Sequence, residues 1–181
     1  MLDFKTFERI SCEAKKSMKK DSDGDEINSK SSKILFFLIF YVLPFGISFF
    51  AFHKKIIISE IAEYIGTVIS IFTGLFFSLL LSIEDKVKNQ RDNKDRQDSN
   101  FQKYKENMKQ ISNIVLYIIL LGVEIFMLLF LNSLFGNYLD GCIEILITIV
   151  TSFLLMRFII SLLFVIQRFY YTSRDEIGNI L

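Results

Sequence analysis

Four long apolar blocks decide what this chain can fold into. They cover residues 34–52, 61–83, 114–134 and 143–166 of the 181-residue sequence, and within each block apolar side chains occur without a polar face. A helix needs roughly 18 or more apolar residues to cross the hydrocarbon core of a bilayer. A spanning segment must also satisfy its backbone hydrogen bonds internally, which favours helices. The sequence therefore predicts an all-α, polytopic membrane protein with four transmembrane helices.

Basic residues are distributed unequally over the connections between these blocks. Eight Lys or Arg residues precede the first block and eight lie between the second and the third, whereas the first connection has Lys54 and Lys55 and the third has none. Because Lys and Arg are enriched in cytoplasmic loops, we expect both termini and the middle connection in the cytoplasm. The net charge of +1 hides this asymmetry. The predicted location is the inner (plasma) membrane, with several passes.

The polar parts of the chain divide into three predicted cytoplasmic segments. Residues 1–33 combine a basic amphipathic helix with an acidic linker. Such a helix either rests on anionic lipid or packs on the cytoplasmic part of the same protein, and the sequence leaves both open. Residues 84–110 contain no Gly or Pro and predict a charged helical hairpin between the second and third spans. Residues 167–181 form a tail behind the transmembrane domain of residues 34–166.

The second apolar block carries a small residue at every fourth position. This stripe consists of Ala62, Gly66, Ser70, Gly74, Ser78 and Ser82. Helices in a bilayer associate through close backbone contact at small residues, so the stripe predicts a helical partner. A step of four residues overshoots a helical turn by about 40°, so one straight neighbour cannot follow the whole stripe. A narrow polar path lined by the serines and glycines is the alternative, and we favour packing.

A kink is expected in the first span. Pro44, the only proline of the chain, lies near the middle of this span and is followed by Gly46. Proline removes one backbone donor and clashes with the preceding turn, and neighbouring helices can tolerate such a break. We favour a static bend over a gating hinge.

Two charged residues fall inside predicted spans. Glu124 lies near the middle of the third span and Arg157 in the inner half of the fourth. A charged side chain that faces lipid costs roughly 2.5–3.5 kcal/mol on insertion scales, so both should face protein or water. We predict an ion pair between Glu124 and Arg157 that fixes helix register. The alternative is an oligomer in which these groups ring a central path, where Glu124 would favour cations or Arg157 anions.

The predicted hairpin is the largest polar surface and therefore the best candidate for binding another protein. Phe101, Tyr104 and Met108 follow helical spacing along it. Its basic and acidic side chains are too evenly balanced to indicate a nucleic-acid site. A cytosolic protein partner is the expectation instead.

The sequence contains no motif that would carry catalysis. HExxH, GxSxG, P-loop and Gly-rich nucleotide turns are all missing from it, so neither a catalytic site nor a cofactor is expected. Cys12 and Cys142 are too far apart along the chain to form a metal motif. On the predicted topology these cysteines lie on opposite sides of the membrane, which excludes a disulfide between them. We therefore predict a protein that is not an enzyme and holds no metal.

Three functions are compatible with these features. We favour a homo-oligomer that perturbs the bilayer or conducts across it, since small residues, intramembrane charges and very short outer connections fit such an assembly. The alternative is a membrane-embedded sensor or anchor that signals to a cytosolic partner through residues 84–110. A small transporter is a further alternative, although the two halves of the chain show no internal repeat.

In its layout the chain resembles the compact four-span membrane proteins that accompany bacterial anti-phage systems. Examples are the membrane subunit of the Kiwa system and the membrane accessory proteins of RNA-targeting CRISPR loci. The shared features are length, both termini inside, a charged cytoplasmic hairpin and short outer connections, and no sequence motif is shared. The resemblance implies an inner-membrane oligomer that detects infection or disrupts membrane integrity, together with a cytosolic partner.

Overall fold

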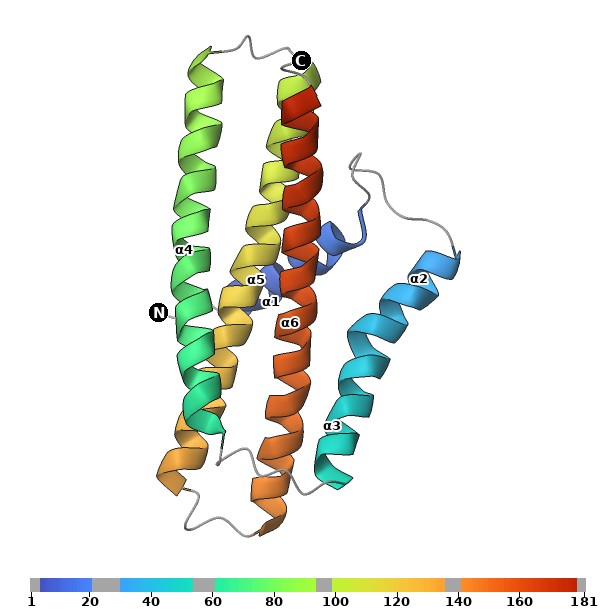
Figure 1. Cartoon of the computed structure of the whole chain (residues 1–181), viewed down its shortest axis with the longest axis vertical. Helices are drawn as coiled ribbons and strands as arrows, with labels where there is room; N and C mark the ends of the chain where they lie inside the picture. The colour runs from blue at the N-terminus through green and yellow to red at the C-terminus, as the bar shows by residue number, and fades with distance from the viewer. Residues whose placement is uncertain (1–3, 21–29, 54–60, 94–98, 136–140, 179–181) are drawn as a thin grey trace.

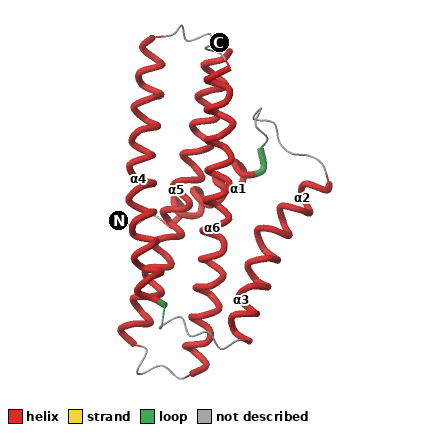
Figure 2. Tube along the Cα trace, viewed as in Figure 1, coloured by secondary structure: helices red, strands yellow, loops and turns green. Residues whose placement is uncertain are grey.

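The computed structural model describes residues 4–20, 30–53, 61–93, 99–135 and 141–178, which are almost entirely helical. The elements are the α-helices α1 (Phe4–Met18), α2 (Lys30–Phe37), α3 (Leu43–His53), α4 (Ala62–Asn93), α5 (Ser99–Phe135) and α6 (Gly141–Gly178), and the π-helix η1 (Leu38–Val42). Figure 2 shows that helices make up nearly all of the described chain, with only short pieces of loop.

Four stretches of helix are long and apolar enough to cross a membrane, which confirms the number of predicted spans. They are Lys30–Phe50, Ala62–Asp85, Tyr104–Leu134 and Ile145–Thr172. The described part of the chain is therefore nearly all helical, and its four apolar helices are those of a multi-pass membrane protein. Helix α4 continues to Asn93 and α5 begins at Ser99, so both helices extend beyond the apolar parts of their spans. Helix α6 likewise continues through residues 167–178, which the sequence analysis set apart as a tail.

The spanning helices stand in a row rather than in a closed bundle (Figure 1). Helix α4 packs on α5, α5 packs on α6, and α6 packs on α3. No comparable packing joins α3 to α4, the helices at the two ends of the row, in the described part of the chain. Phe72 of α4 does reach Phe158 of α6, with ring centroids 6.3 Å apart. An open row leaves long apolar helix faces for lipid or for other protein chains.

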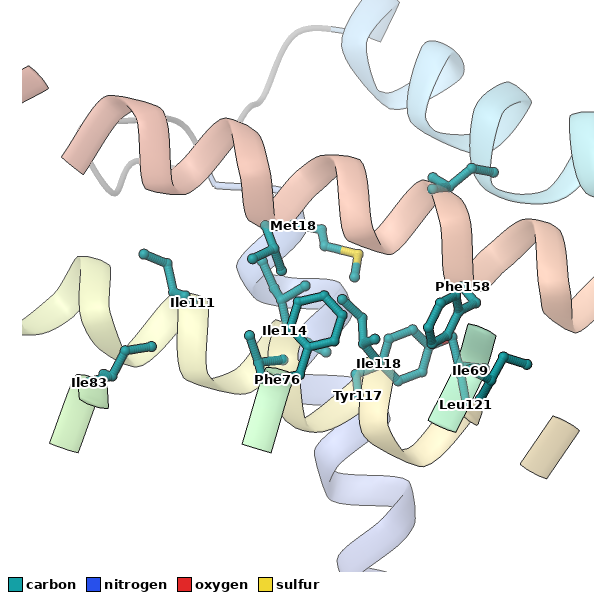
Figure 3. Packing of buried hydrophobic residues seen from close by; sticks show 14 of the residues in the cluster. Met18, Ile69, Phe76, Ile83, Ile111, Ile114, Tyr117, Ile118, Leu121 and Phe158 are labelled. Atoms are coloured by element: carbon teal, nitrogen blue, oxygen red, sulfur yellow. The ribbon is translucent and has the colours of Figure 1, made fainter. Parts of the chain in front are cut away.

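Helix α5 forms the centre of the row. Ile111, Ile114, Ile118, Leu121 and Ile125 are almost fully buried, and their alternating steps of three and four residues place them on one helix face. Figure 3 shows part of this face packed against Met18 of α1, Phe76 and Ile69 of α4, and Phe158 of α6. Because lipid tails are as apolar as these side chains, dispersion contacts hold the spans together within the membrane.

The first span is interrupted in the turn that precedes Pro44. The Leu43 N–H donates to the Leu38 carbonyl, which is the five-residue step of a π-helix. Pro44 lies just after η1, in the first turn of α3, and it has no N–H to donate to the carbonyl of Phe40 one turn earlier. The carbonyl of Pro44 accepts a hydrogen bond from Ser48 Oγ at 2.8 Å. The ribbon changes direction between α2 and α3, so the predicted kink is produced by the π turn together with the proline (Figure 1).

Helix α1 lies across the row and packs on α5 (Figure 1). Ala14, Ser17 and Met18 are buried in this contact. On the exposed face of α1, Arg9 Nε donates to Glu13 Oε1 at 2.9 Å, which lowers the pKa of the Glu13 carboxyl. The sequence is compatible with a helix on the lipid surface or a helix packed on the same protein. The structure shows α1 packed on α5.

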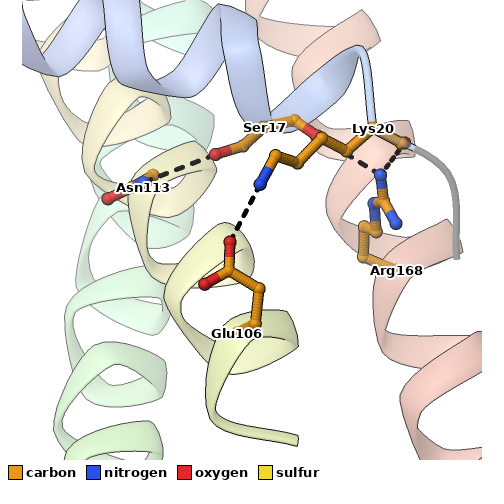
Figure 4. A network of polar contacts seen from close by, with 5 residues as sticks. All are labelled: Ser17, Lys20, Glu106, Asn113 and Arg168. Carbon is orange, nitrogen blue, oxygen red and sulfur yellow. Dashed lines mark hydrogen bonds and ion pairs between the residues drawn. The ribbon is translucent and has the colours of Figure 1, made fainter. Parts of the chain in front are cut away.

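A network of polar contacts fastens the end of α1 (Figure 4). Arg168 of α6 donates through Nη2 to the carbonyl oxygens of Ser17, at 3.3 Å, and of Lys20. The Ser17 carbonyl also accepts from the Lys20 backbone N–H at 3.3 Å, and Lys20 lies just beyond the end of α1, so Arg168 ties the turn that follows α1 to α6. Lys20 Nζ also pairs with Glu106 Oε1 at 2.9 Å, and Asn113 Nδ2 donates to Ser17 Oγ at 3.4 Å.

Candidate functional site

Arg157, one of the two predicted intramembrane charges, lies among four aromatic rings. Its guanidinium carbon is 5.0 Å from the ring centroid of Phe40 and 5.7 Å from those of Tyr41, Tyr117 and Phe153. Rings at these distances attract a cation through their quadrupoles, and the attraction grows when water is excluded. The buried Nε and Nη2 atoms have no hydrogen-bond partner among the described residues. The aromatic rings therefore replace the hydration of this arginine.

The π-helix η1 supplies two of these four rings. Phe40 and Tyr41 are neighbours in the sequence, and in an α-helix their side chains would point about 100° apart. A π turn contains more residues than an α-helical turn, so the angle between consecutive side chains around the helix axis is smaller. Both rings can then lie over Arg157, and Phe40 becomes fully buried. The irregular turn before Pro44 thus builds one wall of the arginine site.

The predicted ion pair between Glu124 and Arg157 is not formed. Among the described side chains, the ion pairs join Arg9 to Glu13, Lys20 to Glu106, and Lys88 to Glu84. Arg157 is held by the aromatic rings instead, and Glu124 is exposed on α5, where the charge of Arg157 still acts on it without a direct ion pair. The positions of Glu124 and Arg157 along the sequence predict their depths in the spans, but not the directions of their side chains around the helix axes. These directions decide whether the two charges meet.

The small-residue stripe faces away from the rest of the chain over most of its length. Ser70, Gly74, Ser78 and Ser82 are exposed, and a Cβ placed on Gly66 or Gly74 would meet nothing within 4 Å. Ser78 Oγ donates to the Gly74 carbonyl of its own helix at 3.2 Å. At the other end of the stripe, Ala62, Gly66 and Ser70 line a groove of about 660 Å³ between α4 and α5. The helical partner predicted for the exposed part of the stripe is not found within the described chain.

The close contact between α4 and α5 occurs at a glycine that the sequence analysis did not single out. A Cβ on Gly122 of α5 would lie 2.8 Å from Thr73 Oγ1 and 3.2 Å from Ile69 Cγ2 of α4. The two helices can approach this closely only because Gly122 has no side chain. Its signal in the sequence is weak, since it stands alone in the third apolar block rather than in a repeating stripe.

The predicted partner surface on the hairpin needs correction. Tyr104 and Met108 are buried, because this face of α5 belongs to the core that also contains Met18 of α1. The side chain of Phe101 lies outside the described residues. An accessible feature of this region is a groove of about 720 Å³ between α4 and α5, whose charged lining residues are Glu84, Lys88, Lys105, Glu106 and Lys109.

The described residues contain no group of three or more His, Cys, Asp or Glu side chains placed to hold a metal ion. Cys12 is exposed as a free thiol, and the side chain of Cys142 lies outside the described residues.

Comparisons of the chain with protein-family models, with curated proteins and with solved structures give no match.

Proposed function

We propose that the protein is a homo-oligomer of the inner membrane that conducts ions across the bilayer and so perturbs it. The observation that carries this proposal is the exposed side chain of Glu124, which lies within the third span and forms no ion pair with a described side chain, although the charge of Arg157 acts on it electrostatically. An isolated carboxylate that faced lipid would cost several kcal/mol, so intramembrane charges usually face water or another protein. An aqueous path between subunits provides both.

The outward face of α4 supports assembly through a second copy of the chain. Gly66 and Gly74 have open space around them, and small residues are the usual contact points of helices in lipid. Four exposed positions of the stripe lie on the helix at one end of the row. A neighbouring subunit packed there would extend the row and could close it into a ring around Glu124.

The two intramembrane charges have different roles in this proposal. Arg157 is enclosed by rings of its own chain and stabilises the packing of η1, α5 and α6. Glu124 faces outward and sets the selectivity, because carboxylate side chains along a pore favour cations. We therefore expect a cation-selective conductance rather than an anion-selective one.

Conductance of the purified protein in planar bilayers under a KCl gradient tests this proposal. The wild-type protein should give a reversal potential of the sign for cations, and Glu124→Gln should move that potential toward zero. Glu84→Gln is the matched control, because it removes an exposed carboxylate near the end of the apolar part of α4 and should leave selectivity unchanged. Arg157→Gln should reduce thermal stability and keep the cation preference. A silent bilayer with an intact oligomer, or a selectivity insensitive to Glu124→Gln, would refute conduction through this path.

A sensor or anchor is the second candidate function, and the groove between α4 and α5 at the hairpin favours it. This groove combines the charged residues named above with apolar Leu80, Ile83 and Val87, a lining that suits a protein partner. Overproduction of the chain alone separates the two functions. A conductor should depolarise the cells, whereas a sensor should leave the membrane potential unchanged. A role in anti-phage defence is compatible with conduction and with sensing. It rests on the similarity in layout to the four-span membrane proteins of bacterial anti-phage systems.

A further inference from the structure

The guanidinium of Arg157 is enclosed but forms no ion pair with a described side chain. Its Nε and Nη2 atoms are buried without a hydrogen-bond partner in the described chain, and its carbon lies over four aromatic rings. A ring face attracts a cation, but it does not offer the two parallel hydrogen bonds that a carboxylate offers to an arginine. Arg157 therefore keeps the capacity to bind a carboxylate through these two nitrogens.

Glu124 lies on the same side of α5 as the arginine site. It follows Tyr117 by seven residues, which is about two helical turns, so the two side chains share one face of α5. The ring centroid of Tyr117 is 5.7 Å from the Arg157 guanidinium carbon, and the charge of Arg157 acts on the Glu124 carboxyl without an ion pair. The two intramembrane charges are thus close enough to attract each other and are not in contact.

The directions of the two side chains favour an approach. Phe153 precedes Arg157 by about one turn of α6, and its ring centroid is 5.7 Å from the guanidinium carbon, so the arginine extends toward the beginning of α6. Helices α5 and α6 run in opposite directions (Figure 1), so this direction also leads from Tyr117 to Glu124 along α5. The Cβ of Glu124 tilts toward the beginning of α5, as in any α-helix. Changes of side-chain rotamers therefore move the guanidinium and the carboxylate toward each other.

We propose that Arg157 closes the conduction path by leaving its aromatic rings and pairing with Glu124, an autoinhibitory contact within one chain. This regulation rests on the conduction proposed above, in which an unpaired Glu124 sets the selectivity. Water around Glu124 weakens the attraction between the two charges and so favours the aromatic position of the arginine. Loss of water from the path strengthens this attraction. The pair then neutralises the carboxylate that attracts cations.

The aromatic rings set the balance between the two positions of Arg157. Tyr41 of η1 is partly buried, and its ring centroid is 5.7 Å from the guanidinium carbon. Tyr41→Leu removes one cation–π contact and keeps an apolar side chain, so it should shift the arginine toward Glu124. Phe45→Leu is the matched control, because it removes an exposed ring of the same span that does not lie over the arginine.

A double-mutant cycle on thermal unfolding in detergent detects the pair without any measurement of current. Glu124→Gln, Arg157→Gln and their combination are compared in the wild type and in the Tyr41→Leu and Phe45→Leu backgrounds. The two substitutions should be nearly additive in the wild type and in Phe45→Leu. In Tyr41→Leu their coupling should change the unfolding equilibrium constant by about tenfold or more. Equal coupling in all three backgrounds, or none in Tyr41→Leu, would overturn the proposal.

Two further backgrounds guard against an effect of misfolding. Phe153→Leu removes a ring that α6 contributes to the site and should produce the same coupling as Tyr41→Leu. Tyr41→Phe keeps the ring and should remain nearly additive. Coupling in Tyr41→Leu that neither Phe153→Leu reproduces nor Tyr41→Phe abolishes would overturn the role of the rings.

Currents in planar bilayers test the regulatory part of the proposal. Tyr41→Leu should reduce the current about fivefold or more, because a shifted equilibrium leaves fewer open paths. Addition of Glu124→Gln should restore the size of this current with a weaker cation preference. Coupling in the cycle together with an unchanged Tyr41→Leu current would overturn the autoinhibitory role. A silent wild-type protein would refute conduction and this role with it, while the cycle would still show whether Arg157 exchanges its rings for Glu124.

Discussion

Gly122 determines how closely α4 and α5 approach each other. A Cβ at this position would lie 2.8 Å from Thr73 Oγ1, a distance that real Cβ atoms avoid. We predict that Gly122→Ala destabilises the fold by about 1–3 kcal/mol, the usual cost of overpacking. Gly46→Ala is the control, because open space surrounds that position, it lies outside the small-residue stripe, and alanine has the higher helix propensity. Unfolding in detergent measures both changes. Equal stability of the two variants would show that α4 and α5 are not in close contact at Gly122.

Individual residues also show where sequence reasoning reaches its limit. The need to shield Glu124 and Arg157 follows from the cost of charge in lipid, but their partners depend on the rotation of each helix about its axis. The π turn at Leu38–Val42 changes that rotation within the first span, and it brings Phe40 and Tyr41 to Arg157. Pro44 indicated a disturbance in this region, yet nothing in the sequence specified a five-residue hydrogen bond.

Helix α1 is attached to α6 at its C-terminal end. Arg168 is largely buried and donates to the carbonyl oxygens of Ser17 and Lys20. We predict that Arg168→Gln loosens α1, since the shorter side chain leaves the Lys20 carbonyl without the Arg168 donor and leaves the Ser17 carbonyl with only the Lys20 backbone N–H. Hydrogen–deuterium exchange in the amides of α1 should rise about tenfold or more. Arg9→Gln removes only an exposed pair within α1 and should leave that exchange almost unchanged. An unaltered rate in Arg168→Gln would contradict the docking through this residue.

The extents of the elements were largely predictable, and their packing was not. Long apolar runs predict the spanning parts of α4 and α5, and the lack of Gly and Pro in residues 84–110 predicts that both helices extend beyond the apolar part of each span. The amphipathic pattern of α1 predicted a helix with one apolar face, but a lipid surface and a protein surface require the same pattern. The buried Ala14 and Met18 show which surface covers that face. Tyr104 and Met108 were misassigned for a related reason, because apolar residues on a polar helix can serve a core as well as a partner.

The row of helices has two ends, α4 and α3, and each of these end helices has one outward side without a neighbouring helix in the described chain. Helix α4 ends the row on one side and packs on α5, with the exposed part of the stripe facing outward. We predict that Gly74→Leu lowers the oligomer size or raises its dissociation constant by about tenfold or more, because a bulky side chain keeps a neighbouring backbone away. Mass photometry in nanodiscs or chemical crosslinking in membranes measures this effect, and conductance should fall together with assembly.

The matched control for Gly74→Leu is Gly46→Leu. Gly46 also lies in an apolar helix, and a Cβ there would likewise meet nothing within 4 Å, but it belongs to α3 at the other end of the row and to no stripe. Leucine at this position should face lipid and leave the oligomer intact. Equal loss in both variants would mean that any bulky residue on an outer face disturbs assembly, whereas no loss in Gly74→Leu would place the subunit contact elsewhere. Selective loss in Gly74→Leu would identify α4 as the subunit contact, since Gly46→Leu adds the same bulk to an outward helix face outside the stripe.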